Sequence, residues 1–307
     1  MGGLLVIGDV VTDVVALHHA PVATGTDTAA DIVVRPGGSG ANTASWAAHL
    51  GADTRILTRV GYDTGPWHIA ELRGAGVHPH VRVDPAHPTA VVIAMVDVTG
   101  ERSMLTNRGA GGRIGPGDWD DGLLDGVSHL HISGYTLFAE PGLELVRLAV
   151  RAALARDVRI SVDPASTGFL RDFGPDRFLA ETAAATIIIP NRDEALLLTG
   201  ETDVADAAAA LSARYGMAAV KLGAGGALLA VAGRVVHRAP AVTARAVDST
   251  GAGDAFAAGF LSALLPGDSP ESALEAGCLA GAEAVTRLGG RPGSASGVHS
   301  VTGSGIG

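Results

Sequence analysis

A glycine-rich turn that ends in a carboxylate, residues 248–254, stands directly before an apolar run, residues 255–265, that is typical of a helix. Such a turn leaves backbone N–H groups without helical partners, and these groups favour an anion together with the helix dipole. We therefore expect Gly251, Ala252 and Gly253 to form an anion hole. Asp254 would repel the anion, so we expect it to accept a proton from the group that attacks a phosphate. The alternative for Asp254 is a helix cap without chemistry.

A second glycine-rich turn, residues 37–42, precedes a helical pattern over residues 43–50. The turn matches neither the Walker phosphate loop nor the dinucleotide-binding fingerprint. The amide of Asn42 offers both a donor and an acceptor, which suits a polyol. The candidate substrate-binding residues of this turn are Gly37, Gly38, Ser39 and Asn42.

Two acidic residues, Asp9 and Asp13, follow an apolar run at residues 4–7 that is typical of a buried strand. Ligands of open α/β sheets bind beyond the carboxyl ends of the strands, so both residues are candidates for holding ligand hydroxyl groups. A turn-capping role is the alternative for each. Arg108, which ends a strand-like run, could reach a polar or anionic group of the substrate, with a solvated arginine as the alternative.

Polar side chains also follow two later predicted strands. Asn191 and Glu194 follow the first of these strands, and an amide and a carboxylate so placed can orient the water shell of Mg²⁺. Lys221, the single lysine among 22 basic residues, ends the next strand, where its ammonium suits nucleotide phosphates. The turn that follows supplies the candidate nucleotide-binding residues Gly223, Gly225 and Gly226. The alternatives are a capping pair, a lysine that reaches solvent, and a tight turn.

The order of these motifs resembles the ribokinase-like carbohydrate kinase family of the PfkB type. The matching positions are residues 37–44, Gly51, Gly61, the pair Asn191 and Glu194, and residues 248–261. The likeness covers about residues 3–292. One departure follows Asp163 and Pro164, where the family often carries an Asn and an Arg and this chain has Ala165, Ser166 and Thr167.

The resemblance implies transfer of the γ-phosphoryl group of ATP to a hydroxymethyl group of a small sugar or related polyol. It implies ATP and Mg²⁺ as cofactors, with K⁺ as a candidate third. The roles it implies are substrate contacts at Asp13 and residues 38–42, Mg²⁺–phosphate contacts at Asn191 and Glu194, nucleotide contacts at Lys221 and residues 223–226, an anion hole at residues 251–253, and Asp254 as the base.

Strand and helix patterns alternate over residues 1–292, which predicts an α/β domain with a doubly wound, mostly parallel sheet and helices on both faces. Strand-like runs at 30–35, 89–98 and 102–107, the last two joined at Thr99 and Gly100, predict a small inserted sheet. This lid, from about residues 14–35 and 89–108, would cover the sugar, and its exposed edge could pair with a second copy in a homodimer. Residues 293–307 are rich in Gly and Ser and predict a disordered tail.

Composition excludes several classes of partner. The 307-residue chain has a net charge of −10 and no basic run, which disfavours nucleic acid. No apolar run reaches the ~18 residues of a membrane span, and the single cysteine fits a reducing compartment. We therefore expect a cytoplasmic protein without a membrane partner. His78 with His80, and His129 with His131, could share strand faces as metal ligands, but no third ligand stands near either pair.

Two other functions stay open at this point. A nucleoside kinase of the same family would need an apolar or aromatic pocket for the base. Aromatic residues make up 4% of the chain, and Trp46, Tyr62 and Trp67 are the candidates near the N-terminal turns. A non-catalytic sugar-sensing protein would tolerate loss of the base or of the cation residues, all of which are present.

Overall fold

The computed structural model describes residues 2–98 and 102–293. Within these residues the larger sheet has nine strands in the order β13-β12-β11-β10-β9-β8-β1-β4-β5. The strands are β1 Gly3–Ile7, β4 Thr54–Gly61, β5 His78–Asp84, β8 Val127–Ser133, β9 Arg159–Asp163, β10 Ile187–Ile188, β11 Met217–Lys221, β12 Ala227–Val231 and β13 Arg234–Ala239. Neighbouring strands pair in parallel at all positions except one edge, where β12 pairs antiparallel with both β11 and β13.

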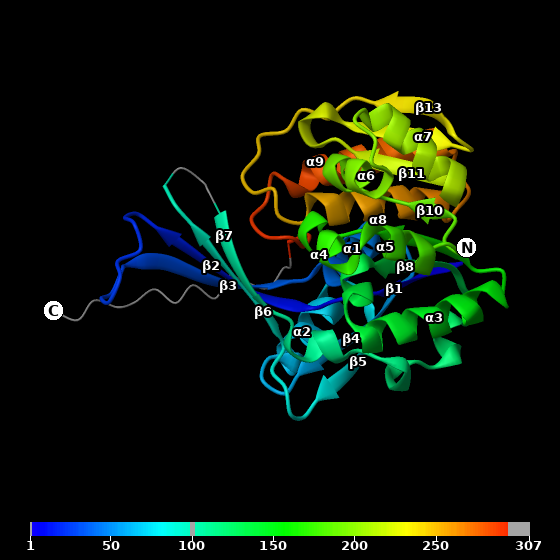
Figure 1. The fold of residues 1–307 in the computed structure, drawn as a ribbon. Helices are drawn as coiled ribbons and strands as arrows, with labels where there is room; N and C mark the ends of the chain where they lie inside the picture. Colours follow the sequence, from blue (N-terminus) through cyan, green and yellow to red (C-terminus); the bar gives the residue numbers. More distant parts are fainter. Residues whose placement is uncertain (1, 99–101, 294–307) are drawn as a thin grey trace.

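Helices cover both faces of this sheet (Figure 1), as the alternating pattern predicts. One face carries α3 Glu140–Leu154, α4 Thr167–Phe173, α5 Pro175–Glu181, α6 Arg192–Thr199 and α7 Val204–Tyr215. The other carries α1 Ser39–His49, α2 Gly65–Gly74, α8 Ala252–Leu264 and α9 Pro270–Ala284. Because side chains alternate along a strand, Leu5 of β1 packs in the first core and Leu4 in the second. A strand buried on both faces is apolar throughout, which explains the run at the start of the chain.

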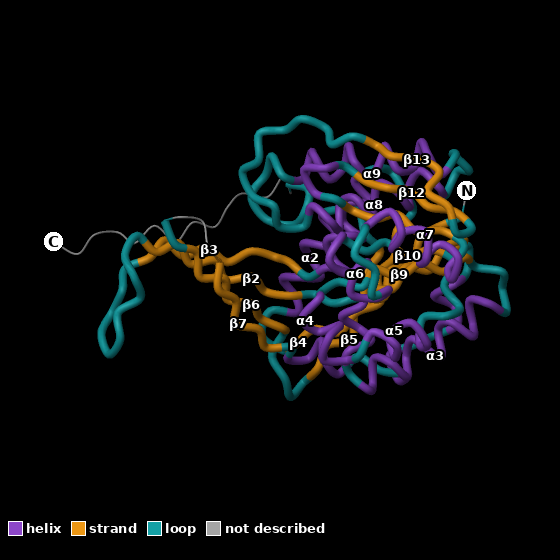
Figure 2. Tube along the Cα trace, turned by 45° about the horizontal axis from the view of Figure 1, so that its top comes forward, coloured by secondary structure: helices purple, strands orange, loops and turns teal. Residues whose placement is uncertain are grey.

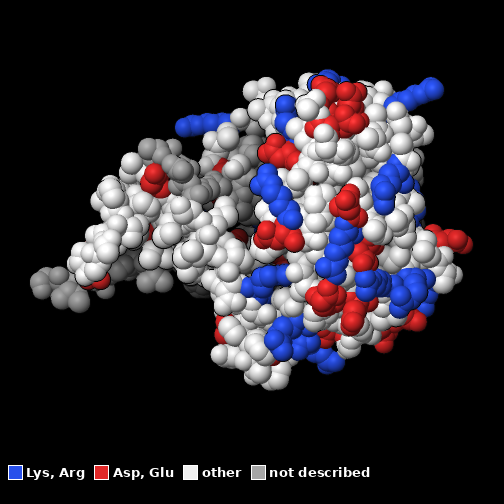
Figure 3. All heavy atoms as spheres, viewed as in Figure 1, with Lys and Arg blue, Asp and Glu red and all other residues white. Residues whose placement is uncertain are grey.

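A second sheet of four strands projects from the main body (Figures 1 and 2). Its strands, in the order β3-β2-β6-β7, are β3 Ala30–Gly37, β2 Val11–His18, β6 Ala90–Val96 and β7 Arg102–Asn107. The expected small sheet is thus confirmed, with the antiparallel pair β6 and β7 as its hairpin. The expected turn at Thr99 and Gly100 lies outside the described residues. We call this four-stranded sheet the lid. On the face drawn in Figure 3 it carries few charged side chains, whereas the main body carries many of both signs.

The sequence pattern missed three elements. The first is β2, a regular strand of eight residues, which makes the lid begin at Val11 and not near residue 14. Asp13 interrupts the apolar pattern of this strand in the sequence. The helix α4 and the full extent of β5 were also not predicted, since neither shows a clear apolar period, although the spacing of His78 and His80 does predict that both lie on one strand. Short 3₁₀ turns occupy Gly109–Arg113, Pro116–Asp118, Asp121–Leu124, Gly134–Phe138 and Gly223–Gly225.

Two predicted helices begin earlier than expected: the helix expected over residues 43–50 is α1, which starts at Ser39, and the helix expected over residues 255–265 is α8, which starts at Ala252. All of the predicted tail except Gly293 lies outside the described residues. Among the helices that the structure does describe, none has the length and apolar character that crossing a membrane requires.

Candidate active site

A cavity of about 500 Å³ opens where the carboxyl ends of the main-sheet strands meet the lid. Asp9 follows β1, Asp163 ends β9, Asn191 follows β10 and Lys221 ends β11, and all four line the cavity. Val92 of β6 lines it from the lid. The expectation that strand ends would bring the polar residues together is therefore correct, and its reason is the common direction of parallel strands.

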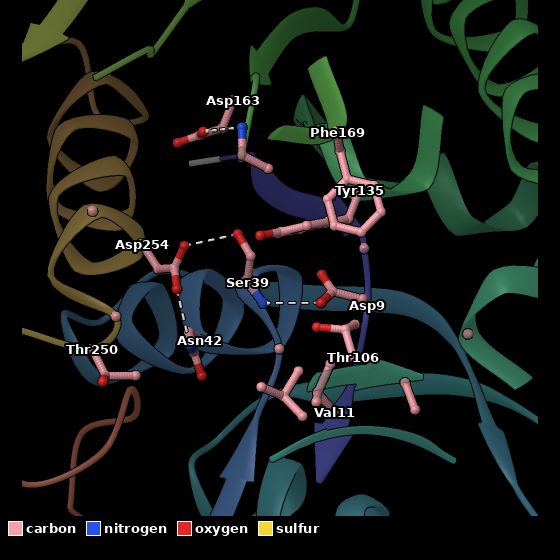
Figure 4. Close-up of a pocket in the computed structure, with 18 of the residues that line it drawn as sticks. Asp9, Val11, Ser39, Asn42, Thr106, Tyr135, Asp163, Phe169, Thr250 and Asp254 are labelled. Atoms are coloured by element: carbon pink, nitrogen blue, oxygen red, sulfur yellow. Dashed lines mark hydrogen bonds between the residues drawn. The ribbon is translucent and has the colours of Figure 1, made fainter. Parts of the chain in front are cut away.

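Asp254 lies in the first turn of α8 and faces α1 across the cavity (Figure 4). Ser39 Oγ donates a hydrogen bond to Asp254 Oδ1, and Asn42 Nδ2 donates one to Oδ2, both at 2.8 Å. Burial raises the pKa of Asp254 to about 7, although these two hydrogen bonds act in the opposite direction. No side-chain cap bond is recorded for α8 within the described residues, so the geometry does not support a helix cap as the role of Asp254.

The turn before Asp254 has the geometry of an anion site. Gly251 is the N-cap residue of α8 with φ 74°, and a Cβ there would lie 2.4 Å from the Cα of Gly290, so glycine is required. In the described part of the chain, the backbone N–H groups of Gly253 and Asp254 meet no acceptor. Lys221 Nζ would lie 3.5 Å from a Cβ built on Gly253, which places an ammonium beside the turn. Ala252, the middle residue of the expected anion hole, does not line the cavity, and its N–H donates to the carbonyl oxygen of Ser249 at 3.3 Å, so it is not open to an anion as those of Gly253 and Asp254 are.

Lys221 and Asp163 form a buried ion pair, with Nζ 2.5 Å from Oδ2. The carboxylate raises the pKa of Lys221 although burial alone would lower it, so the ammonium keeps its charge. A lysine that reaches out to solvent is therefore excluded. Glu194 also lies close enough to raise the pKa of Lys221, so the ammonium interacts with two carboxylates.

Asn191 and Glu194 form a reciprocal cap at the start of α6. Asn191 Oδ1 accepts from the Glu194 N–H at 2.9 Å, and Glu194 Oε2 accepts from the Asn191 N–H at 2.8 Å. The capping alternative is thus correct as local structure, yet both side chains also line the cavity. Burial, and next the charge of Asp163, raise the pKa of Glu194 to about 7. Glu194 Oε1 has no recorded partner in the described chain and remains available to a ligand.

The carboxylates at this site suit Mg²⁺ only when nucleotide phosphates supply further ligands. Across residues 2–98 and 102–293, no cluster of three His, Cys, Asp or Glu side chains could enclose a metal ion. Mg²⁺ bound to nucleotide phosphates keeps several waters and needs one or two carboxylates, which Glu194 and Asp163 can supply.

The histidine pair His129 and His131, a candidate for metal binding from the sequence, lies inside the core. Each ring shares a hydrogen bond of 2.8 Å with Ser161 Oγ, and burial lowers the pKa of both rings.

The acidic residues of the predicted substrate site are held by backbone contacts. Asp9 accepts hydrogen bonds from the N–H groups of Ser39 and Gly40, so it caps α1 from outside the helix. A Cβ on Gly37 would lie 2.0 Å from Asp13 Oδ2, so only glycine leaves room for that carboxylate. Burial, and then the charge of Asp9, raise the pKa of Asp13 to about 6. Asp9, Asp13 and Gly38 line the cavity and Gly37 does not, so substrate contact at the first three remains a prediction.

Arg108 lies at the cavity and is partly buried, so it is not a fully solvated side chain. Its Nη1 donates to the carbonyl oxygen of Phe138 at 2.9 Å, and its Nη2 donates to that of Tyr135 at 2.5 Å. The guanidinium also lies over the ring of Phe169, 6.0 Å from the centroid. These contacts anchor the 3₁₀ turn Gly134–Phe138 beside the cavity, and a direct contact between Arg108 and a substrate stays a prediction.

Several residues of the cavity escaped the sequence analysis. Asp163 could have been found by the strand-end rule that indicated Asp9, but Tyr135, Phe169 and Thr106 carry no local signal. In the nucleotide turn Gly223 lines the cavity, whereas Gly225 and Gly226 only shape the turn. The N-terminal aromatic candidates do not line it: Trp46 is buried in the core, Tyr62 is exposed, and Trp67 packs on His68.

Comparison with known proteins agrees with this geometry. The family model described as pfkB family carbohydrate kinase matches residues 1–296. An ATP-dependent ribose-1-phosphate kinase of Halopiger xanaduensis is 33% identical over 258 residues, which is 83% of this chain and 82% of that protein.

Solved structures share the fold over nearly the whole chain. Adenosine kinase from Sinorhizobium meliloti has a TM-score of 0.86 at 28% identity and covers 95% of this chain and 96% of that one. A ribokinase-like protein from E. coli, solved with ATP and Mg²⁺, has a TM-score of 0.85 at 25% identity, with 96% of both chains covered. Members of the family are ATP-dependent kinases. With its motifs, fold and cavity in agreement, the chain belongs to the PfkB family of carbohydrate kinases.

Proposed function

We propose that this protein transfers the γ-phosphoryl group of ATP to a hydroxymethyl group of a small carbohydrate, with Asp254 as the general base. The observation that carries the proposal is the position of Asp254 beside the open N–H groups of the α8 turn and the ammonium of Lys221. A base with a pKa of about 7 is matched to proton transfer near neutral pH.

Each residue has a defined part in this scheme. The hydrogen bonds from Ser39 and Asn42 fix the orientation of the Asp254 carboxylate, so that it can accept the hydroxyl proton. The N–H groups of Gly253 and Asp254, with Lys221, stabilise negative charge that develops on the transferred group. Asn191 and Glu194 would hold the water shell of Mg²⁺, which when bound with ATP neutralises phosphate charge.

The lid has the task of excluding water. Val11, Val92 and Met104 present apolar side chains to the cavity from three lid strands, so closure over a bound acceptor would remove water from the reacting groups. Exclusion of water limits the hydrolysis of ATP in place of transfer to the acceptor.

The relatives differ in the acceptor that their names give, which is ribose 1-phosphate in one and adenosine in another. ATP and Mg²⁺ are the cofactors we propose, by similarity to the E. coli structure. K⁺ remains a hypothesis, and comparison of turnover in K⁺ and Na⁺ buffers tests it. A cytoplasmic site of action, where ATP is abundant, is also part of the proposal.

The function is tested by ADP release from ATP with a panel of free sugars, sugar phosphates and nucleosides, with and without Mg²⁺. We expect release that depends on Mg²⁺ and on at least one acceptor with a hydroxymethyl group, with product phosphorylated at that carbon. ADP release that no acceptor stimulates would contradict the proposal.

A further inference from the structure

The end of the cavity away from the α8 turn has an aromatic wall. Phe169 of α4 contacts Tyr135 at 5.7 Å between ring centroids, with the rings nearly perpendicular. Phe138 stacks on Phe169 at 5.7 Å with an interplanar angle of 10°, and Phe173 packs behind Phe138 at 5.6 Å. Phe169 and Tyr135 line the cavity, whereas Phe138 and Phe173 support them from outside. Figure 4 shows both cavity rings on one side of the site, near Asp9 and Ser39.

Apolar side chains of the lid complete this end of the cavity. Val11 on β2, Val92 on β6 and Met104 on β7 line it, together with Ile114. Phe169, Tyr135 and Val92 are partly exposed and Met104 is exposed, so a ligand that covers them gains free energy from burial. A free monosaccharide could pack one C–H face on a ring of this wall, but its other hydroxyl groups would lack partners against the apolar lid side chains.

The charges at the cavity argue for an uncharged acceptor. Asp9 and Asp13 line the cavity and make the electrostatic potential negative at the end where the acceptor would bind. Of the described residues that line the cavity, two are cationic: Arg108 has both terminal nitrogens bonded to carbonyl oxygens, and Lys221 is paired with Asp163 beside the α8 turn. A phosphorylated or carboxylated acceptor would therefore meet two carboxylates and one guanidinium, Arg108, whose charge already acts on Asp9, so the charge of the acceptor would be poorly balanced.

From these observations we propose that the acceptor is an uncharged nucleoside. Its 5′-hydroxymethyl group would face Asp254, its ribose hydroxyl groups would lie toward Asp9 and Asp13, and its base would pack between the Tyr135–Phe169 wall and the apolar lid. Thr106, whose side chain lies beside Asp9 in Figure 4, adds a hydroxyl group within reach of polar ring atoms. This inference rests on the proposed kinase function and specifies its substrate.

The experiment measures ADP release and calorimetric binding with uridine, adenosine, ribose, fructose and ribose 1-phosphate. We expect at least one of the two nucleosides to have a kcat/KM more than about tenfold above that of any sugar. Phe169→Ala should lower nucleoside binding and kcat/KM by about ten- to a hundredfold, the usual effect of losing a base-stacking ring. Turnover of ribose should change less than about twofold. Phe173→Ala is the matched control, since it removes a ring of the same cluster that does not line the cavity.

The outcomes separate this inference from the function on which it rests. Preference for ribose, fructose or ribose 1-phosphate, with equal effects of the two phenylalanine variants, would overturn the nucleoside assignment and leave the kinase function intact. Nucleoside binding that Phe169→Ala weakens and Phe173→Ala does not, without any ADP release, would uphold the site and contradict the kinase function. Absence of both binding and turnover with every nucleoside would overturn the inference.

Discussion

The two ends of the cavity are built differently. At the phosphate-transfer end, Asp254, Lys221 and Asp163 are partly or fully buried side chains held by hydrogen bonds or an ion pair on elements of the main sheet and α8. At the acceptor end, Phe169 and Met104 are partly or fully exposed and come from a short helix and a lid strand. The contrast suggests that the first end fixes the reaction and the second selects the acceptor, which can change without disturbing the main sheet.

Contacts near the base of the lid link the two ends. Arg35 of β3 donates to the carbonyl oxygen of Leu288 at 3.2 Å, and buried Arg291 donates to that of Gly37 at 2.9 Å. Both bonds tie the end of β3 to the segment that follows α9. These two bonds lie next to Gly38 and Ser39, so a movement of the lid at this point would act on the residue whose hydroxyl group orients Asp254.

The largest effect should come from the phosphate-transfer end. Asp254→Asn should lower kcat by about 10²–10⁴, because it removes the base. The fold should survive: Asn42 Oδ1 is buried without a recorded partner, so rotation of the Asn42 amide can bond the new side chain. Calorimetric affinities for ATP and acceptor should change little. A loss of kcat below about tenfold would remove Asp254 from the role of base, and loss of both affinities would make it structural.

The next effect concerns the cation site at the same end. Glu194→Gln should raise the Mg²⁺ concentration for half-maximal turnover by about tenfold, as expected when a residue that orients the cation shell loses its charge. Acceptor affinity should stay nearly constant, since Glu194 acts through Mg²⁺ and phosphate. The glutamine side chain can still accept the Asn191 N–H bond, so the cap of α6 is preserved. An unchanged Mg²⁺ response would argue against the assignment.

A smaller effect concerns the outer face of the lid. Strand register places Val34, Val14, Ile93 and Leu105 in one row across its four strands, on the face opposite Asp13 and Val92. Val34, Ile93 and Leu105 are exposed. We propose that a second copy covers this row, giving a homodimer.

Sedimentation of the wild type at micromolar concentration should therefore show a dimer. Ile93→Asp should shift it toward monomer, and Leu279→Asp, at an exposed position of α9 outside the lid, serves as the control. A wild type that sediments only as a monomer would contradict the dimer.

The smallest effect concerns the backbone between the two ends. Ala165 lines the cavity with φ 71°, a left-handed conformation that is unfavourable for alanine. Ala165→Gly should stabilise the protein by about 0.5–1 kcal/mol, because relief of this strain exceeds the entropy that glycine loses on folding. Chemical denaturation measures the change. A clear loss of stability would show that the alanine methyl group contributes packing that outweighs the strain.

The sequence predicted the phosphate-transfer end far better than the acceptor end. Glycine turns before helices and polar residues after strands carry local signals, and parallel pairing brings those strand ends to one edge, as Asp254, Asn191 and Lys221 illustrate. Phe169 and Tyr135 meet only through the packing of α4 against the turn after β8, which no periodicity encodes. For the same reason the base-pocket candidates Trp46, Tyr62 and Trp67 were wrong, since nearness in sequence to the glycine turn did not place them in the cavity.

The most direct test of the central claim is the pH dependence of kcat/KM for the acceptor at saturating ATP and Mg²⁺. Asp254 must be ionised to accept a proton, so kcat/KM should rise with pH through a midpoint near 7 and then stay constant. Because the pKa of Glu194 is also raised to about 7, the profile is repeated in Glu194→Gln. We expect the rise of kcat/KM near pH 7 to persist in Glu194→Gln and to disappear in the residual activity of Asp254→Asn. A rise near pH 7 that vanishes in Glu194→Gln, or that remains in Asp254→Asn, would contradict the role of Asp254 as the base.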